Sequence, residues 1–290
     1  MSFAEAALNG LMLGGLYGLF GLGLALAFGI MRIVNVAHGE FVVLAAFLGM
    51  SLVTLTPLPL PLVVICVAAA AFALGWLLQA AVLNRVLGPN PIPPMVITIG
   101  LAIVVRNVLV KIFGADIRTI DIGPLQEKGL QLFGMSIGVV PLIIFGVALV
   151  LFYGMHMILQ HTVMGRAFRA AADDYEILET LGFNRRRVYS AAMGVAVMLS
   201  AIAGLLLAMR SSFTPFSGVE RLLIAFEVVI IGGLGSLRGC FFGGLFLGVV
   251  QVVGLKIAPN SGPLFGHLAF FVVLLLRQAG LPFFVAWSRP

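Results

Sequence analysis

The sequence has few charged residues and few cysteines. Only 10% of its 290 residues are charged, whereas 61% are hydrophobic. Soluble domains do not need so apolar a composition, and apolar stretches of about 20 residues are typical of transmembrane helices. The two cysteines, Cys66 and Cys240, both lie in apolar runs, so they indicate neither a disulfide framework nor a metal site. The first residues lack the basic region of a cleavable signal and are expected to enter a membrane span directly.

Motifs for covalent chemistry, nucleotide binding and metal binding are also missing. Ser236 lies in a glycine-rich break, but its surroundings are not the nucleophile elbow of a hydrolase. His38 and Glu40 are two positions apart, and His156 and His161 five apart; neither is a convincing metal-ligand spacing. No Walker A pattern predicts ATP binding by a P-loop. The net charge of +6 is not a nucleic-acid footprint, because the positive residues fall at the ends of predicted spans. We therefore predict no enzyme activity, no bound metal and no nucleic-acid partner.

Continuous apolar runs predict an all-helical membrane bundle of about eight transmembrane helices. Strands of a membrane barrel would alternate apolar and polar residues, which these runs do not. The whole chain, 1–290, is expected to form a single transmembrane domain, and its polar segment 115–136 has room for a small hairpin or a short helix. Whether 222–237 crosses fully or forms a half-helix is left open. The apolar runs are 6–30, 41–55, 62–83, 95–113, 139–159, 188–209, 222–237, 239–255 and 264–276.

The positions of lysine and arginine predict the orientation of the chain. Successive loops are expected to lie on alternating sides of the membrane. The loops of one side are rich in arginine, whereas the positive residues in the loops of the other side are balanced by aspartate and glutamate. The arginine-rich side is expected to be cytoplasmic, which places the N-terminus outside and the C-terminus inside. The arginines of that side are Arg32, Arg85, Arg166, Arg169, Arg185, Arg186, Arg187, Arg238, Arg277 and Arg289.

The stretch 165–189 is too polar to lie in the hydrocarbon core, where each charge would cost several kcal/mol. Its Ala, Leu and Glu residues favour a helix over 167–181, and Gly182 stands where that helix would end. Four apolar positions recur at spacings of three and four, so they share one face: Ala171, Tyr175, Leu178 and Leu181. The pattern predicts a short amphipathic cytoplasmic helix, which is either an unpartnered loop helix or a docking element.

Glycine-rich segments occur in both halves of the chain. Segment 10–23 contains six glycines, many of them four residues apart, which favours close helix packing inside the bundle. Segment 232–239 interrupts an apolar run, and its glycines indicate either close packing or non-helical backbone along a transport pathway. Glu227 precedes this break. An ionisable residue at such depth predicts a pathway residue, or else a structural partner for a basic residue such as Arg106.

Three stretches, in this order, resemble bacterial permease subunits for branched-chain amino acid import. Segment 8–41 resembles the opening of those permeases, a glycine-rich helix followed by Asn35 and a polar turn that ends in Gly39 and Glu40. Segment 165–188 resembles their cytoplasmic coupling loop, and 228–248 resembles their GGLGS-x-x-G segment. The likeness covers nearly the whole chain and is closest to the shorter of the two permeases. Glu227 and His38 depart from the family pattern.

This resemblance implies a multi-pass permease subunit of an ATP-binding-cassette importer in the bacterial inner membrane. The implied substrate is a branched-chain or related amino acid. The implied partners are a second permease in a heterodimer, two ATP-binding subunits that bind the ATP, and a periplasmic substrate-binding protein; the chain itself would need no cofactor. Urea, short-chain amide and sugar permeases are alternatives, and so is a self-sufficient channel or secondary transporter.

The resemblance also implies two groups of site residues. ATP hydrolysis on the partner subunits would rock the helix of the cytoplasmic loop 161–187 and so switch the access of the bundle. The residues expected to couple to the ATPases are Arg166, Asp173, Tyr175, Leu178, Leu181 and Gly182. The residues expected along the translocation pathway are Asn35, His38, Glu40, Glu227, Gly232, Gly233, Gly235 and Ser236.

Overall fold

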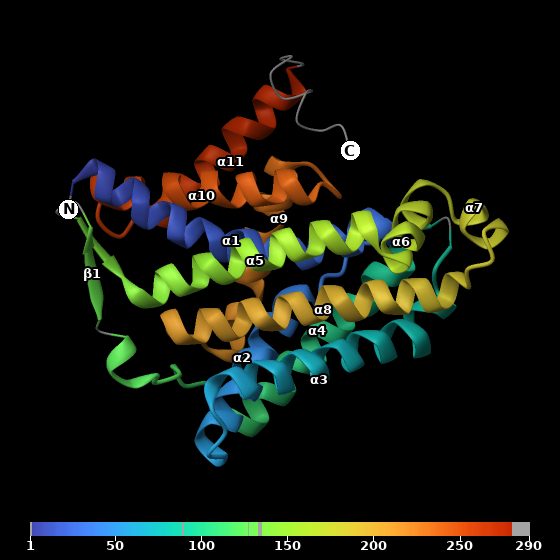
Figure 1. Ribbon diagram of the computed structural model, residues 1–290, viewed down its shortest axis with the longest axis horizontal. Coiled ribbons are helices and arrows are strands. Elements are labelled where there is room, and N and C mark those ends of the chain that lie inside the picture. Colours follow the sequence, from blue (N-terminus) through green and yellow to red (C-terminus); the bar gives the residue numbers. More distant parts are fainter. Residues whose placement is uncertain (1, 89, 127, 133–134, 280–290) are drawn as a thin grey trace.

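The computed structural model describes residues 2–88, 90–126, 128–132 and 135–279, and it confirms a polytopic helical bundle (Figure 1). Seven described helices are long and apolar enough to cross a membrane. They are α1 (Phe3–Met31), α2 (His38–Leu55), α3 (Leu60–Ala81), α4 (Ile92–Phe113), α5 (Val139–His161), α8 (Arg185–Arg210) and α10 (Leu237–Ile257). Two further helices are shorter: α11 (Gly262–Gln278), which is apolar, and α9 (Gly218–Gly232), which carries three charged residues.

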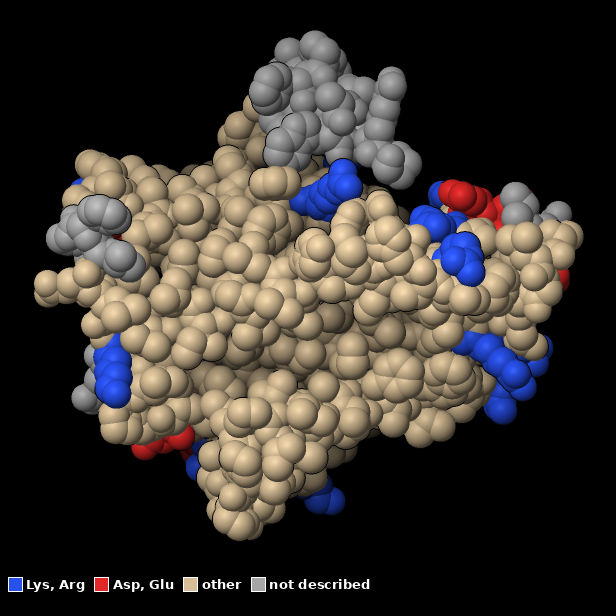
Figure 2. All heavy atoms as spheres, viewed as in Figure 1, with Lys and Arg blue, Asp and Glu red and all other residues tan. Residues whose placement is uncertain are grey.

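The centre of the bundle consists of α1 and α8. In each of them 83% of the most apolar window is buried inside the chain, whereas the corresponding share is 22% for α3 and α5 and 17% for α4. The outer helices therefore turn most of their apolar surface toward lipid or toward another membrane subunit. Figure 2 shows charged side chains at both ends of one face and at its upper edge, with a broad uncharged surface between them.

Glycines set the distance between α1 and α10. A side chain at Gly14 would meet the Cα of Leu245 at 2.5 Å, and one at Gly10 would meet the Cα of Val249 at 2.6 Å. From the side of α10, Gly244 and Gly248 face the backbone of α1 in the same way. The predicted close packing of the first span is therefore confirmed, because backbones this near leave no room for a Cβ atom.

The contacts at the ends of the neighbouring helices show whether segment 222–237 crosses the bundle fully. Ala208, near the end of α8, accepts a hydrogen bond from Ile120 in the loop before the β-hairpin (3.1 Å), and the second strand of that hairpin contacts α1. Gly235, before α10, lies instead against Gly29 near the end of α1. The chain thus passes from one end of the bundle to the other through α9 and its flanks. Helix α9 has only 15 residues, so the chain also needs the non-helical segments on both sides of α9 to cross the bundle.

The prediction of a bundle of about eight transmembrane helices is consistent with this fold. Within the described residues, seven helices are candidate spans and α11 is a shorter apolar helix, while the 15-residue α9 crosses only together with its flanks.

The polar loop before α5 was expected to contain a small hairpin or a short helix. The structure has a β-hairpin there. Strands β1 (Gly129–Leu132) and β2 (Met135–Gly138) are antiparallel, with Gly129 opposite Gly138. Arg118 and Phe213 form a separate backbone bridge, with 2.9 Å hydrogen bonds in both directions. This bridge ties the loop after α4 to the loop after α8 at the end of the bundle where α1 begins.

The opposite end of the bundle carries the charged segment, which contains two helices and not the single helix predicted over 167–181. Helix α6 (Val163–Asp173) is capped by Thr162, whose hydroxyl accepts a hydrogen bond from the Gly165 amide at 2.9 Å. Asp174 is extended (φ −156°, ψ 130°), and its carbonyl accepts from the Leu178 amide in α7 (Tyr175–Thr180). Aspartate competes with helical backbone and favours caps, which explains the break.

Candidate functional site

The chain turns back into the bundle between α1 and α2. Helix α1 ends at Arg32, which is left-handed (φ 52°), residues 32–35 are not helical, and α2 begins at His38. The His38 side chain reaches Phe20, close to the middle of α1. Asn35 and His38 therefore lie at a break inside the bundle and not in a solvated cytoplasmic turn.

His38 connects three helices at this break. Its Nε2 lies 2.7 Å from the Phe20 carbonyl oxygen of α1, and since a carbonyl can only accept, Nε2 carries the proton. The Ser200 hydroxyl of α8 lies 3.2 Å from Nδ1. The ring is buried, so in this conformation it stabilises the junction of α1, α2 and α8 and does not line an open pathway.

Asn35 holds the turn itself. Its side-chain oxygen accepts a hydrogen bond from the Ala37 amide at 3.1 Å, and its Nδ2 lies 3.7 Å from the sulfur of Met193. The next amide, of Val36, donates to the hydroxyl of Thr98 in α4 at 3.2 Å. Asn35 and Thr98 are both buried. The resemblance marked Asn35, whereas Thr98 stood out in the sequence only as a polar residue within an apolar span.

Glu40 forms the main ion pair of the bundle. Its Oε1 accepts from both Nε and Nη2 of Arg106 in α4. The carboxyl group also packs against Gly218, the first residue of α9, where the positive end of the helix dipole favours a negative charge. The other oxygen, Oε2, is buried and has no hydrogen-bond partner among the described residues. Glu40, α4 and α9 thus meet at one charged centre.

Replacing Arg106 with leucine is expected to destabilise the folded permease by about 3–5 kcal/mol, because the Glu40 carboxylate would remain buried without its partner. Glu40 is only 2% exposed, whereas Arg106 is 27% exposed. In the variant the Glu40 carboxylate would therefore lose its partner at a site that water hardly reaches. Thermal unfolding in detergent measures the effect. The double variant Glu40→Gln, Arg106→Leu is expected to recover most of the stability. Equal stability of Arg106→Leu and the wild type would contradict a structural ion pair here.

Glu227 has a partner that the sequence did not suggest. Arg106 is engaged by Glu40, so the hypothesis of a Glu227–Arg106 pair is wrong. Glu227 instead hydrogen-bonds to Nδ1 of His267 in α11, and Arg277 of α11 donates to the Ile230 carbonyl at 2.9 Å. These two contacts attach the short helix α11 to α9. The only hint in the sequence was a histidine within an apolar helix.

The break after α9 is explained by turn geometry and close packing. Gly233 (φ 95°) and Gly235 (φ 85°) adopt left-handed conformations that residues with a Cβ atom disfavour. Gly232 packs directly against the backbone of Gly239. The Ser236 hydroxyl accepts from the Gly239 amide at 3.1 Å and caps α10. Turn geometry and close packing thus account for these glycines. A pathway role for this break stays a prediction.

The predicted coupling residues do not form one exposed ridge. Leu178 is 0% exposed and belongs to the hydrophobic core, whereas Leu181 is 61% exposed. The expectation that Leu178 is free to enter a partner's groove is therefore wrong, because the loop folds back and buries this side chain. Arg166 and Asp173 are exposed. The side chain of Tyr175 lies outside the described part of the chain.

Gly182 ends α7 as predicted. Its φ is +80°, its amide donates to the Glu179 carbonyl at 3.0 Å, and the following amide donates to Leu178 at 3.2 Å. This left-handed glycine is the usual device that stops a helix and redirects the chain. It leads into α8, where the Asn184 side chain accepts a hydrogen bond from the Arg187 amide.

The described residues contain no cluster of three or more histidine, cysteine, aspartate or glutamate side chains that could hold a metal ion. Several buried polar side chains, among them His38, Glu40 and Glu227, instead pair with side chains or backbone of other helices. This arrangement can position helices and present charged groups within the membrane.

Comparison with known proteins identifies relatives along the whole chain. Residues 6–276 match the family described as the permease component of branched-chain amino acid transport systems. The high-affinity branched-chain amino acid permease BraD of Pseudomonas aeruginosa is 27% identical over 96% of this chain and 95% of its own length. LivH of Salmonella typhimurium, named for the same transport, has the same identity and coverage. The fructose import permease FrcC of Rhizobium meliloti is 27% identical over 65% of this chain and 54% of its own. No solved structure matched.

Proposed function

The chain belongs to the family of permease components of branched-chain amino acid transport systems, and from this premise we propose that it imports branched-chain amino acids as one subunit of an ATP-driven complex. The family consists of transport permeases and is not enzymatic. The observation that carries the proposal is the match to branched-chain permeases over 96% of the chain. The shorter match to the fructose permease makes a sugar substrate the weaker alternative.

The proposed complex contains a second permease in a heterodimer, two ATP-binding subunits and a periplasmic binding protein. The exposed apolar surface of the outer helices leaves room for a neighbouring membrane subunit as well as for lipid. ATP is bound by the partner subunits in this proposal. Purification of the tagged permease from cells that express the whole transport system tests it. Recovery of the ATP-binding subunits in stoichiometric amounts is expected, whereas a self-sufficient channel would purify without them.

The loop 161–187 is proposed to transmit ATP hydrolysis to the bundle. Two features support this role: Gly182 ends α7 shortly before the central helix α8 begins, and the loop presents Leu181, Arg166 and Asp173 to solvent. The buried side chain of Leu178 supports the same role, because it anchors α7 to the hydrophobic core of this chain. Motion of α7 would therefore be transmitted to α8 through a packed contact.

The proposed orientation places α6 and α7 in the cytoplasm, the N-terminus and the β-hairpin outside, and the C-terminus inside. In a Cys66→Ala background, cysteine at Ser136 of the hairpin is expected to react with a membrane-impermeant thiol reagent in intact cells. Cysteine at Glu179 of α7 is expected to react only after the membrane is opened. Both positions are exposed, so a lack of labelling would not be due to burial of the side chain. The reverse labelling pattern would overturn the orientation.

A further inference from the structure

A cavity of about 550 Å³ opens at the end of the bundle that carries α6 and α7. The last residues of α1 and α6, the first residues of α8 and the loop before α4 line it together. Its volume is within the range of about 300–1,000 Å³ that is typical of small-molecule sites. Figure 2 shows basic and acidic side chains next to each other at this end of the molecule. In the proposed orientation the cavity opens toward the cytoplasm.

Two arginines give the cavity a positively charged part. Nη2 of Arg32, at the end of α1, donates to the carbonyl oxygen of Ala172 in α6 at 3.4 Å. The guanidinium carbon of Arg185 lies 5.1 Å from the centre of the Tyr189 ring in α8. All four residues line the cavity, so each guanidinium group is held against another lining residue.

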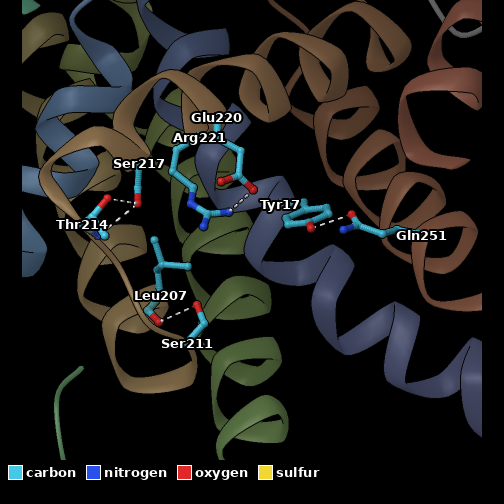
Figure 3. A network of polar contacts seen from close by, with 8 residues as sticks. All are labelled: Tyr17, Leu207, Ser211, Thr214, Ser217, Glu220, Arg221 and Gln251. Atoms are coloured by element: carbon cyan, nitrogen blue, oxygen red, sulfur yellow. Dashed lines mark hydrogen bonds and ion pairs between the residues drawn. The ribbon is translucent and has the colours of Figure 1, made fainter. Parts of the chain in front are cut away.

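Two aspartates at the end of α6, Asp173 and Asp174, line the same cavity. No ion pair joins Asp173 to Arg32 in the part of the chain that the structure describes. At the opposite end of the bundle, Arg221 instead pairs directly with the neighbouring Glu220 at 3.2 Å (Figure 3). The cavity thus presents opposite charges that do not meet directly, and a ligand that carries both charges can bridge them.

Much of the remaining lining is apolar. Ile30 and Met31 from the end of α1, Ile33 after it, Pro91 before α4 and Ala171 of α6 all contribute. An aliphatic group of a ligand would be removed from water against these side chains, which favours binding. The cavity therefore combines three kinds of contact: positive, negative and aliphatic.

We infer that this cavity binds a zwitterionic amino acid with an aliphatic side chain. Its carboxylate would accept hydrogen bonds from Arg32 and Arg185, whose planar donors suit a carboxylate. Its ammonium group would donate to Asp173, and its side chain would lie against the apolar residues. Urea and neutral sugars carry neither charge. The inference rests on the proposed import function for the identity of the ligand, and it adds a site for the imported amino acid at the cytoplasmic end of the central helices.

Protection of a cysteine in the cavity tests the site in the assembled complex without binding protein. In a Cys66→Ala background, Gly88→Cys places a thiol at an exposed lining position where an added Cβ atom meets nothing within 4 Å. At ten times the Kd, leucine is expected to slow maleimide labelling of this cysteine about tenfold, because only about one cavity in ten is then empty. Leucinamide lacks the carboxylate and 4-methylpentanoate lacks the ammonium group, so neither is expected to protect at that concentration. Mass spectrometry of this chain measures the labelling.

Variants of the charged residues connect the protection to the cavity. Arg32→Gln and Asp173→Asn are each expected to raise the leucine concentration for half-protection about tenfold or more, as loss of a charged hydrogen bond predicts. Arg187→Gln and Glu179→Gln make the same changes of charge at exposed positions that do not line this cavity. Both controls are expected to be protected like the wild type.

Each further outcome decides the matter. Equal slowing of labelling at a Glu179→Cys position, equal protection by leucinamide, or unchanged protection in both charge variants would overturn the site. A cysteine at 88 that reacts in the permease pair but not after the ATP-binding subunits join would show that those subunits fill the cavity, and the inference would be wrong. If Gly88→Cys does not assemble, Pro91→Cys offers a second exposed lining position.

Leucine uptake judges the proposed import function separately. Protection by leucine without uptake would keep the site and refute import of leucine. Uptake without protection would keep the import function and refute the site.

Discussion

Replacing Gly248 with leucine is expected to abolish the folded permease. A Cβ atom at Gly248 would overlap the backbone of α1, where it would meet the carbonyl oxygen of Gly10 at 2.5 Å and the Cα of Gly14 at 2.5 Å. Backbone atoms cannot rotate away as side chains do. Helix α1 would have to leave its place between α8 and α10, and overpacking of this kind costs more than about 3 kcal/mol. The yield of monodisperse protein after detergent extraction measures the effect.

The matched control is Gly146→Leu in α5, where an added Cβ atom would meet nothing within 4 Å. This variant introduces the same side chain into another membrane helix and is expected to purify like the wild type. Normal yield of both variants would mean that α1 and α10 do not pack through their glycines. Loss of both would attribute the effect to leucine insertion in general.

Replacing Leu181 with aspartate is expected to abolish uptake while the permease still folds. Leu181 is 61% exposed next to the charged residues of α6 and α7, and exposed apolar surface with a charged rim is typical of docking sites. Burial of one leucine contributes about 1.5–3 kcal/mol, so the substitution weakens ATPase docking by about tenfold to 100-fold. Stimulation of ATP hydrolysis by the binding protein and uptake of labelled leucine measure the loss.

Two comparison variants make this result specific. Leu130→Asp changes an exposed leucine of the hairpin at the other end of the bundle and is expected to retain uptake. Leu178→Asp introduces a charge at a buried position, so it is expected to reduce the amount of folded protein before coupling can be measured. Wild-type uptake by Leu181→Asp would exclude this surface as the coupling element.

The helices and their ends could largely be predicted from the sequence, because hydrocarbon thickness and backbone hydrogen bonding leave few choices for long apolar runs. Glycine spacing in 10–23 predicted the packing of α1, and Gly182 predicted the end of α7. The break at Asp174 was missed. The good average helix propensity of these fifteen residues gave no sign of the extended residue Asp174, at which the first helix ends.

The partners of the buried charges could not be predicted, because they depend on how distant helices pack. Glu40 and Arg106 are 66 residues apart, and Glu227 and His267 are 40 apart. The resemblance marked Glu40 and the apolar surroundings marked Glu227, but nothing in the local pattern indicated the partner of either carboxylate. Leu178 shows the same limit, since helical spacing predicts which residues share a face and not whether that face meets solvent or the chain itself.

ATP-dependent uptake by the reconstituted complex tests the central claim most directly. Proteoliposomes that contain this permease with its partner permease and ATP-binding subunits would receive labelled leucine and the binding protein on the outer side of the transporter and ATP on the cytoplasmic side. We expect accumulation of leucine with ATP and none with a non-hydrolysable analogue. Leucine uptake into proteoliposomes that contain this chain alone, without any ATP-binding subunit, would contradict the account.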